Sequence, residues 1–355
     1  MVPVTRQTWT AITSAAMFLV LVATVAFAPI PFVTWTPGST VDVFGADDGT
    51  DRLAIEGVET YPTTGELRMT TVSRTRADAW LGLPEAMLAF WLPSRDVLPR
   101  EYVYPPGQTA EQAEQQAQLQ MDTSKEDATV AAFLAAGMDL QRLPRVRSVT
   151  VAGPADGRLQ PGDLIESVDN QPVSSAEQVI ELVQSRAVGD TVLFEVRRPS
   201  QNNGLIEVPV PTGAANDDPR RPVVGVSVDI GYLRPGRVNF GIDPRIGGPS
   251  AGLIFSLGIY DRITPGELID RRIVAGTGTI SDGGQVGPIG GIQEKIAGAE
   301  EAGATVFLVP AANCADVAGV ETDMELVRVG SLLDAIRALE ALKDPNRISE
   351  VPRCE

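Results

Sequence analysis

The longest hydrophobic stretch of the chain lies at its start. Residues 9–30 contain no charged side chain and match the roughly 20 residues that cross a bilayer as a helix. We therefore expect a transmembrane anchor over residues 9–30, preceded by a short tail over residues 1–8. A cleaved signal peptide is the alternative, because residues 26–28 (Ala-Phe-Ala) have the small-residue spacing of a cleavage site. Pro29 follows this triplet directly and disfavours cleavage, which favours the anchor.

The region after the anchor mixes strand and helix patterns. Residues 67–73 alternate between apolar and polar side chains, which is the period of a half-buried strand. Residues 109–120 form a polar run typical of a helix, and Thr123 or Ser124 can cap a second helix that carries apolar residues. These patterns predict an α+β region over residues 31–121 without obvious chemistry.

Residues 122–212 are expected to begin with that second helix and to continue, between about residues 143 and 210, as short apolar strands separated by turns. Strands are predicted over residues 146–151 and 191–197, with a helix over residues 175–184 between them. Before this helix, residues 159–165 read Leu-Gln-Pro-Gly-Asp-Leu-Ile. This motif and the order of strands and helix resemble PDZ domains of the bacterial protease type. The resemblance implies a domain that binds extended polypeptides by adding a strand to a sheet edge, with a PDZ fold used only as a spacer as the alternative.

The last part of the chain follows a stretch crowded with Gly, Asn, Asp and Pro. We expect residues 213–222 to form a linker for this reason. Residues 273–309 then read as a strand, a glycine-rich hairpin, a helix over residues 292–302 and another buried strand. The pattern predicts an α/β domain over residues 223–345 and a C-terminal tail over residues 346–355.

Composition and charge limit which partners and which cellular compartment are expected. Hydrophobic residues make up 43% of the 355 residues, as in globular proteins, and the net charge of -17 repels phosphate backbones, so nucleic acid is not an expected partner. Arg6 precedes the anchor and Asp42 is the first charge after it, so the positive-inside rule makes the short tail cytoplasmic and the rest extracytoplasmic. Cys314 and Cys354 form either one disulfide or two free thiols.

A serine and a lysine are the strongest candidates for chemistry in a chain without histidine. Ser250 lies where a glycine-rich turn becomes an apolar helix, whose free N–H groups can hold an oxyanion. Lysine is rare, because only Lys125, Lys295 and Lys343 occur. Lys295 falls in the first turn of the helix predicted over residues 292–302, where the helix dipole and apolar neighbours lower its pKa. Arginine cannot lose its proton, so a lysine at this position indicates a general base.

Both segments resemble the proteolytic domain of the Lon family, in which the motifs Gly-Pro-Ser-Ala-Gly and Pro-Ile-Gly-Gly-x-x-x-Lys carry a Ser-Lys dyad. Residues 248–252 and 288–295 match these motifs, and serine and lysine are 45 residues apart (295 minus 250). The resemblance implies that Ser250 is the nucleophile and Lys295 its general base. It implies that Thr277 supports the site through a hydrogen bond to the lysine.

The same resemblance implies an oxyanion-binding turn made by Gly248, Pro249 and Ala251 around the serine. The chain departs from the ATP-driven members in two respects. Gly247 stands where many members have an aspartate, and the sequence lacks a Gly-x-x-x-x-Gly-Lys-Ser/Thr motif for ATP. We therefore expect a peptidase that does not use ATP.

Taken together, the segments resemble the membrane-anchored PDZ-Lon peptidases of bacteria. The resemblance implies an α+β fold class: an N-terminal transmembrane helix, a PDZ domain with a small β-barrel-like sheet and helices, and a C-terminal Lon-type α/β proteolytic domain. It implies an extracytoplasmic serine endopeptidase of protein quality control, which cleaves unfolded or membrane-associated polypeptides recruited through its PDZ domain. No cofactor and no metal are expected, and a homo-hexamer is implied by the resemblance alone. A catalytically silent, membrane-tethered PDZ adaptor is the alternative, and such a scaffold would tolerate arginine at position 295.

Overall fold

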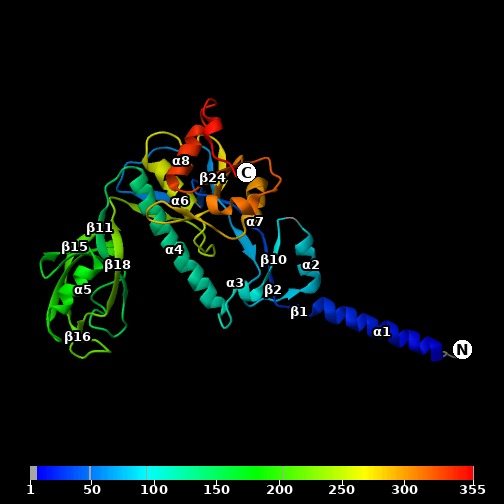
Figure 1. The fold of residues 1–355 in the computed structure, drawn as a ribbon, viewed down its shortest axis with the longest axis horizontal. Helices are drawn as coiled ribbons and strands as arrows, with labels where there is room; N and C mark the ends of the chain where they lie inside the picture. Colours follow the sequence, from blue (N-terminus) through cyan, green and yellow to red (C-terminus); the bar gives the residue numbers. More distant parts are fainter. Residues whose placement is uncertain (1–5, 48, 93, 202, 355) are drawn as a thin grey trace. The chain divides into compact units, whose positions relative to one another are not determined.

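The chain folds into two compact units in the computed structural model. The structure describes residues 6–47, 49–92, 94–201 and 203–354. The first unit contains the residues up to Gly137 together with those from Val238 onward, and the second contains Met138–Arg237, drawn mainly in green in Figure 1. The second unit is therefore inserted into the sequence of the first. This division differs from the sequence-based one, which separated residues 31–121 from residues 223–345.

A five-stranded sheet forms the middle of the first unit. The strand order is β24-β23-β20-β7-β3, and all neighbours are parallel except β3, which runs antiparallel to β7. Met69 of β7 lies opposite Gly276 of β20, so a segment from early in the chain pairs with the strand that leads to Thr277. The region for which no chemistry was expected thus supplies part of the sheet under the candidate site. The strands span Val41–Asp42 (β3), Glu66–Met69 (β7), Ile273–Gly276 (β20), Val306–Pro310 (β23) and Glu325–Val329 (β24).

Helices cover both faces of this sheet. Side chains of successive strand residues point to opposite faces. Val274 of β20 therefore packs into one core with α4, α6 and α8, whereas Ala275 packs into another with α7. The result is a three-layer α/β unit. The helices span Ala110–Ala135 (α4), Gly252–Ile263 (α6), Ile292–Glu301 (α7) and Leu332–Ala341 (α8).

Helix α4 is one continuous helix, so the prediction of two helices was wrong. Thr109 caps it through a capping box with Gln112, and its apolar face buries residues such as Met121. Thr123 and Ser124, expected to be caps, lie in the middle of the helix. The hydroxyl of Thr123 donates to the carbonyl of Leu119, 3.0 Å away, which satisfies it without ending the helix.

The N-terminal segment of the first unit is a long apolar helix, α1 (Arg6–Phe27), which is long and apolar enough to cross a membrane. Strand β1 follows α1 and pairs antiparallel with β9. This pairing connects α1 to the folded part of the unit. A three-stranded sheet of order β10-β2-β8 and several hairpins complete the unit. Their bounds are Pro29–Ile30 (β1), Phe32–Pro37 (β2), Ala46–Asp47 (β4), Thr50–Asp51 (β5), Leu53–Glu56 (β6), Val72–Arg74 (β8), Leu81–Gly82 (β9), Leu83–Trp91 (α2), Asp96–Pro99 (β10), Arg100–Val103 (α3), Arg237–Phe240 (β19), Thr279–Ile280 (β21) and Val286–Gly287 (β22).

The second unit is a six-stranded antiparallel sheet with one helix, α5. The sheet has the order β15-β14-β12-β11-β18, with β13 paired to β12. Ser175 caps α5 as its sequence pattern predicts, and the predicted strand over residues 191–197 is observed as β14. The elements span Gln141–Val149 (β11), Leu164–Val168 (β12), Gln171–Pro172 (β13), Ala176–Gln184 (α5), Thr191–Arg198 (β14), Pro199–Gln201 (η1), Gly204–Pro211 (β15), Gly213–Ala214 (β16), Pro222–Val223 (β17) and Val226–Leu233 (β18).

Residues 213–222 are part of the second unit rather than a linker between domains. Strands β16 and β17 enclose them and pair with each other. Strand β18 then pairs with β11 over most of its length, from Val226 opposite Val149 to Leu233 opposite Gln141. A turn-rich sequence was mistaken for a boundary, because the pairing partner of β18 lies far away in the sequence.

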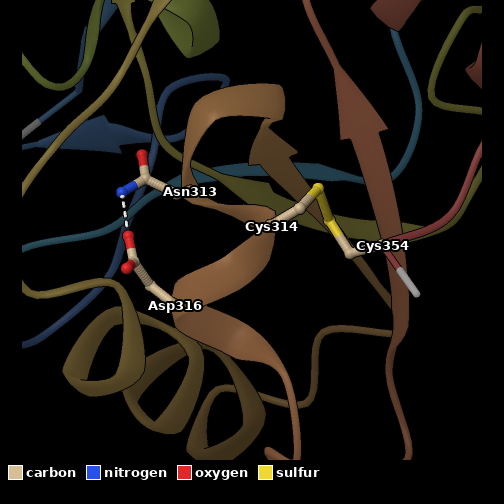
Figure 2. Close-up of a disulfide and its surroundings, with 4 residues drawn as sticks. All are labelled: Asn313, Cys314, Asp316 and Cys354. Atoms are coloured by element: carbon tan, nitrogen blue, oxygen red, sulfur yellow. Dashed lines mark hydrogen bonds between the residues drawn. A yellow bond between two sulfur atoms is a disulfide. The ribbon is translucent and has the colours of Figure 1, made fainter.

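The C-terminal residues, expected as a tail over residues 346–355, pack against the first unit. Val351 is 4% exposed, and the N–H of Arg328 donates to the carbonyl of Pro352, 2.9 Å away. The two cysteines form a disulfide, Cys314–Cys354, which joins the 3-10 helix η2 (Ala311–Val317) to the chain end, as Figure 2 shows. The last helical turn is η3 (Ile348–Glu350).

Candidate active site

Ser250 stands at the N-terminal end of helix α6. Gly248 has a φ of +94°, a conformation that favours glycine, and it turns the chain so that Ser250 comes two residues before the helix begins. The helix that follows is fixed in the core, since Leu253 and Phe255 are fully buried. The serine itself is half-buried, at a place where the N–H groups of a helix start are free.

Lys295 reaches Ser250 from helix α7, on the other face of the sheet. Its Nζ lies 2.8 Å from Oγ of Ser250 and 2.8 Å from Oγ1 of Thr277. The hydroxyl of Thr277, which follows β20, donates in turn to the carbonyl of Ser250 at 3.0 Å. Thr277 therefore offers its oxygen to the lysine and fixes the serine backbone. The structure brings together the three residues that the motifs singled out.

Burial controls the protonation of Lys295. The side chain is 2% exposed, and its apolar neighbours along α7, Ile292 and Ile296, are buried as well. This burial lowers the pKa of Lys295 from 10.5 to about 7, against the opposing effect of the Glu294 carboxylate. A large fraction of the lysine is therefore neutral near pH 7 and able to accept a proton.

Glu294, next to Lys295 in the sequence, is a buried acid that no sequence pattern singled out. It is 1% exposed, and neither carboxylate oxygen has a hydrogen-bond partner among the described residues. Burial, with a smaller contribution from the nearby Asp96 carboxylate, raises the pKa of Glu294 to about 7. Two adjacent residues of opposite charge thus change protonation in the same pH range, as a coupled pair.

Helix α4 holds the loop that carries Ser250. The N–H of Gly248 donates to the carbonyl of Ala117 at 2.8 Å, and the hydroxyl of Ser124 donates to the carbonyl of Pro249 at 3.0 Å. The approach is so close that a Cβ on Gly247 would lie 2.8 Å from Cβ of Ala117. The packing of α4 therefore requires glycine at position 247, and α4 supports the loop from this side.

These contacts also decide which groups are free to hold an oxyanion. The N–H of Gly248 already donates to the carbonyl of Ala117, and Pro249 has no N–H, so these two residues of the expected oxyanion-binding turn shape the turn rather than donate. The amides of Ser250 and Ala251 make no hydrogen bond to any described residue. They lie where the helix dipole is positive, and they are the donors available for a developing negative charge.

The segment that carries the disulfide holds the chain just before helix α7 through hydrogen bonds. The side chain of Asn313 both accepts from the N–H of Ile289 and donates to its carbonyl, each at 3.0 Å. Asn313 also donates to Asp316, as Figure 2 shows. Because Cys314 follows Asn313 directly, the disulfide restrains the residue that fixes the chain before Lys295.

A groove borders the site on the side of α4. It has a volume of about 270 Å³ and reaches Pro249, next to the serine. Leu119 and Ile280 supply apolar surface, whereas Gln116, Gln120 and Thr123 supply polar groups. A substrate side chain could occupy it. No group of three or more His, Cys, Asp or Glu side chains that could hold a metal ion occurs within the described parts of the chain.

Comparisons with known protein families match one segment in each of the two units. Residues 145–198 match the PDZ domain family, and residues 238–338 match the Lon protease (S16) C-terminal proteolytic domain. The fold class predicted from the sequence is confirmed by these matches and by the mixed α/β architecture.

Curated relatives that are similar to this chain include Lon proteases. The Lon protease of Campylobacter concisus is 31% identical over 158 residues, covering 43% of this chain and 19% of the relative. The Lon protease of Chloroflexus aggregans is 28% identical over 181 residues, covering 45% of this chain and 21% of the relative. The chain therefore matches about a fifth of the length of these relatives.

Two PDZ domains are among the solved structures that resemble the chain. The PDZ domain of an SdrC-like protein from Listeria innocua is 30% identical and has a TM-score of 0.22, covering 24% of this chain and 92% of that chain. The PDZ domain of an SdrC-like protein from Listeria monocytogenes is 24% identical with a TM-score of 0.22, covering 24% and 85%.

Proposed function

The chain combines a PDZ domain with a Lon-type proteolytic domain, and from this premise we propose that it is a serine endopeptidase with a Ser-Lys dyad. The observation that carries the proposal is the 2.8 Å distance between Nζ of Lys295 and Oγ of Ser250. The lysine is buried and its pKa is lowered to about 7, so it meets the requirement for a base at neutral pH.

The proposed mechanism is acyl transfer through an acyl-enzyme. Neutral Lys295 accepts the hydroxyl proton of Ser250 while Oγ attacks the peptide carbonyl. The N–H groups of Ser250 and Ala251 hold the oxyanion, and Thr277 keeps the amine aligned through its oxygen. The lysine then gives its proton to the leaving amine, and water releases the acyl group by the same proton transfers in reverse order.

We propose that the substrates are flexible polypeptides, cleaved without ATP. The sequence carries no phosphate-binding loop of the Gly-x-x-x-x-Gly-Lys-Ser/Thr type that would drive unfolding. The PDZ domain supports the idea of a polypeptide substrate, because such domains hold extended peptides along a sheet edge. A hexameric assembly stays a prediction.

We propose further that α1 anchors the protein in a membrane with the catalytic unit outside the cytoplasm. The length and apolar composition of α1 support the anchor, and Arg6 at its start supports the orientation. The Cys314–Cys354 disulfide supports the same side, since disulfides persist in oxidising compartments.

The test is casein cleavage by the full-length protein in detergent, without ATP. Wild type should cleave casein, and Ser250→Ala should be silent. Ser256→Ala is the matched control, because Ser256 lies on α6 and its hydroxyl donates only to the carbonyl of Leu253 at 2.8 Å. The control should keep the wild-type rate. Silence of both wild type and control would favour the adaptor reading over the peptidase.

A further inference from the structure

Helix α2 carries its large apolar side chains outside and its small ones inside. Ala86 and Ala89 are its buried residues. The outward-facing side chains of α2, with Trp80 just before it, are each more than half exposed. We call this group the α2 face: Trp80 64%, Met87 53%, Leu88 60%, Phe90 75% and Trp91 78% exposed. Contiguous apolar surface of this kind marks contact with another apolar body.

The α2 face begins where helix α1 ends. Strand β1 starts two residues after Phe27, and its Ile30 lies opposite Leu81 of β9. Helix α2 follows β9 without a gap, and a Cβ on Gly82 would lie 3.3 Å from the carbonyl oxygen of Ala26. The first turn of α2 is therefore tied to the last turn of α1 by a strand pair and by direct contact.

Helix lengths place α2 near a membrane surface. The 22 residues of α1 extend about 33 Å, which matches a hydrocarbon core of roughly 30 Å. The nine residues of α2 extend only about 14 Å from the point where α1 ends. A helix this short, starting at the end of a membrane span, stays at or near the interfacial layer.

The chemistry of the α2 face fits this layer. Glu85 is the only charged residue between positions 81 and 92, and it lies beside the buried side of the helix. Trp and Phe are the side chains that occupy membrane–water interfaces, with apolar rings below the headgroups. Arg100 lies over the ring of Trp80 at 5.0 Å and places a cation at the border of the face, where lipid phosphates would lie.

We propose that α2 is an interfacial membrane helix, whose α2 face inserts into the outer part of the bilayer beside α1. The inference rests on the proposed anchoring by α1. A second contact with the lipid surface restricts rotation of the catalytic unit about the end of α1 and keeps the site close to the membrane. Polypeptide segments near the bilayer surface are then the favoured substrates.

The experiment places an environment-sensitive fluorophore at Leu88→Cys in the full-length protein, reconstituted into phosphatidylcholine vesicles. Leu333→Cys is the matched control, because Leu333 is an equally ordinary exposed leucine, 48% exposed, on α8. Both variants should cleave casein at the wild-type rate, which shows that they fold. If Leu88→Cys does not fold, Phe90→Cys takes its place. Lipids spin-labelled near the headgroup should quench the probe at position 88 roughly twofold more than the probe at position 333.

Alkaline extraction of the same vesicles separates this inference from the anchoring on which it rests. Protein that resists extraction but shows equal quenching at both positions is anchored by α1, and the proposed role of α2 is then wrong. Protein that is extracted lacks the anchor, and the proposed anchoring is then wrong. A probe at position 88 that is shifted to the blue but not quenched by lipid is covered by protein, such as a second copy of the chain, which also overturns the inference.

Discussion

Lys295 and Glu294 are adjacent residues of helix α7, one basic and one acidic. Both change protonation in the same pH range. Burial lowers the pKa of the lysine and raises that of the glutamate, each to about 7. Neighbouring groups of opposite charge stabilise each other's charged forms, so the carboxylate opposes the effect of burial on the lysine. Glu294 therefore influences how much neutral base is present at a given pH.

The pH dependence of activity follows from the sign of these shifts. The proposed mechanism requires neutral Lys295, so kcat/KM should fall about tenfold per unit as the pH drops below about 7. Glu294→Gln removes the carboxylate that raises the pKa of the lysine, so the acid limb of the profile should move to lower pH. Peptide cleavage measured between pH 5 and pH 9 tests this, a range of roughly two units on each side of a pKa of about 7.

Glu301→Gln is the matched control for this profile, because Glu301 is exposed at the end of the same helix. Its profile should coincide with that of wild type. A profile of Glu294→Gln that coincides with wild type, or moves to higher pH, would show that the acid does not act on the base.

The residues at the centre of the site could be predicted, whereas those around them could not. Ser250, Lys295 and Thr277 occur in local motifs, and the structure brings their polar atoms together. Glu294 gave no such signal, because a glutamate on a helix is usually solvated, and Asp96, which acts on its pKa, lies on β10, distant in sequence. The hydrogen bond that occupies the N–H of Gly248 depends equally on a contact from another element, helix α4.

Helix α4 was the element predicted least well from the sequence. Its contacts nevertheless hold the loop that carries Ser250. Thr123 and Ser124 are typical cap residues, which is why the pattern divided the helix in two. In the folded chain the apolar face of α4 packs on α6, and Ser124 donates to Pro249. Tertiary packing overrides the local preference for a helix cap. Ser124 instead donates a hydrogen bond to the loop that carries Ser250.

The contact between α4 and this loop predicts the effect of a single methyl group. Gly247→Ala should reduce kcat by about tenfold to a hundredfold, because its Cβ would lie 2.8 Å from Cβ of Ala117 and would displace the loop. Ala117→Gly alone should leave kcat close to wild type and cost about 1 kcal/mol of stability. Peptide cleavage rates and urea unfolding measure both effects.

The double variant Gly247→Ala/Ala117→Gly decides whether the clash is the cause. It should recover part of the lost kcat, since the Cβ of Ala117 is the nearest atom that the new methyl group meets. Wild-type kcat in Gly247→Ala, or no recovery in the double variant, would mean that α4 does not set the position of Ser250.

At the scale of the whole molecule, the catalytic unit is assembled from segments on both sides of the inserted PDZ domain. Strand β7 pairs with β20, and α4 packs on α6, although each pair is separated by the insertion. Sequence patterns locate elements well but carry little information on which distant strands pair. The boundaries failed for this reason, whereas the fold class, which rests on motifs and local periodicity, is confirmed.

The disulfide ties the end of the chain to this assembly, and its removal should lower the stability of the first unit. Cysteines 40 residues apart close a loop whose entropy corresponds to about 4 kcal/mol, so Cys314→Ala/Cys354→Ala should cost about 2–4 kcal/mol. Activity should fall at elevated temperature first, because Asn313 next to Cys314 fixes the chain before Lys295. Urea unfolding with and without dithiothreitol measures this.

Reductant provides the control for the disulfide. Dithiothreitol should destabilise wild type to the level of the double variant and leave the double variant unchanged. Equal stability of oxidised wild type and double variant would contradict the structural role given to the bridge.

The most direct test of the central claim is casein cleavage by Lys295→Arg, without ATP and above pH 7. Arginine keeps the charge but cannot lose its proton, so activity should fall by about a thousandfold or more, to the level of Ser250→Ala. The matched control, Lys343→Arg, changes an exposed lysine after α8 and should retain wild-type activity. A Lys295→Arg variant that keeps substantial activity while Ser250→Ala is silent would show that Lys295 is not the base.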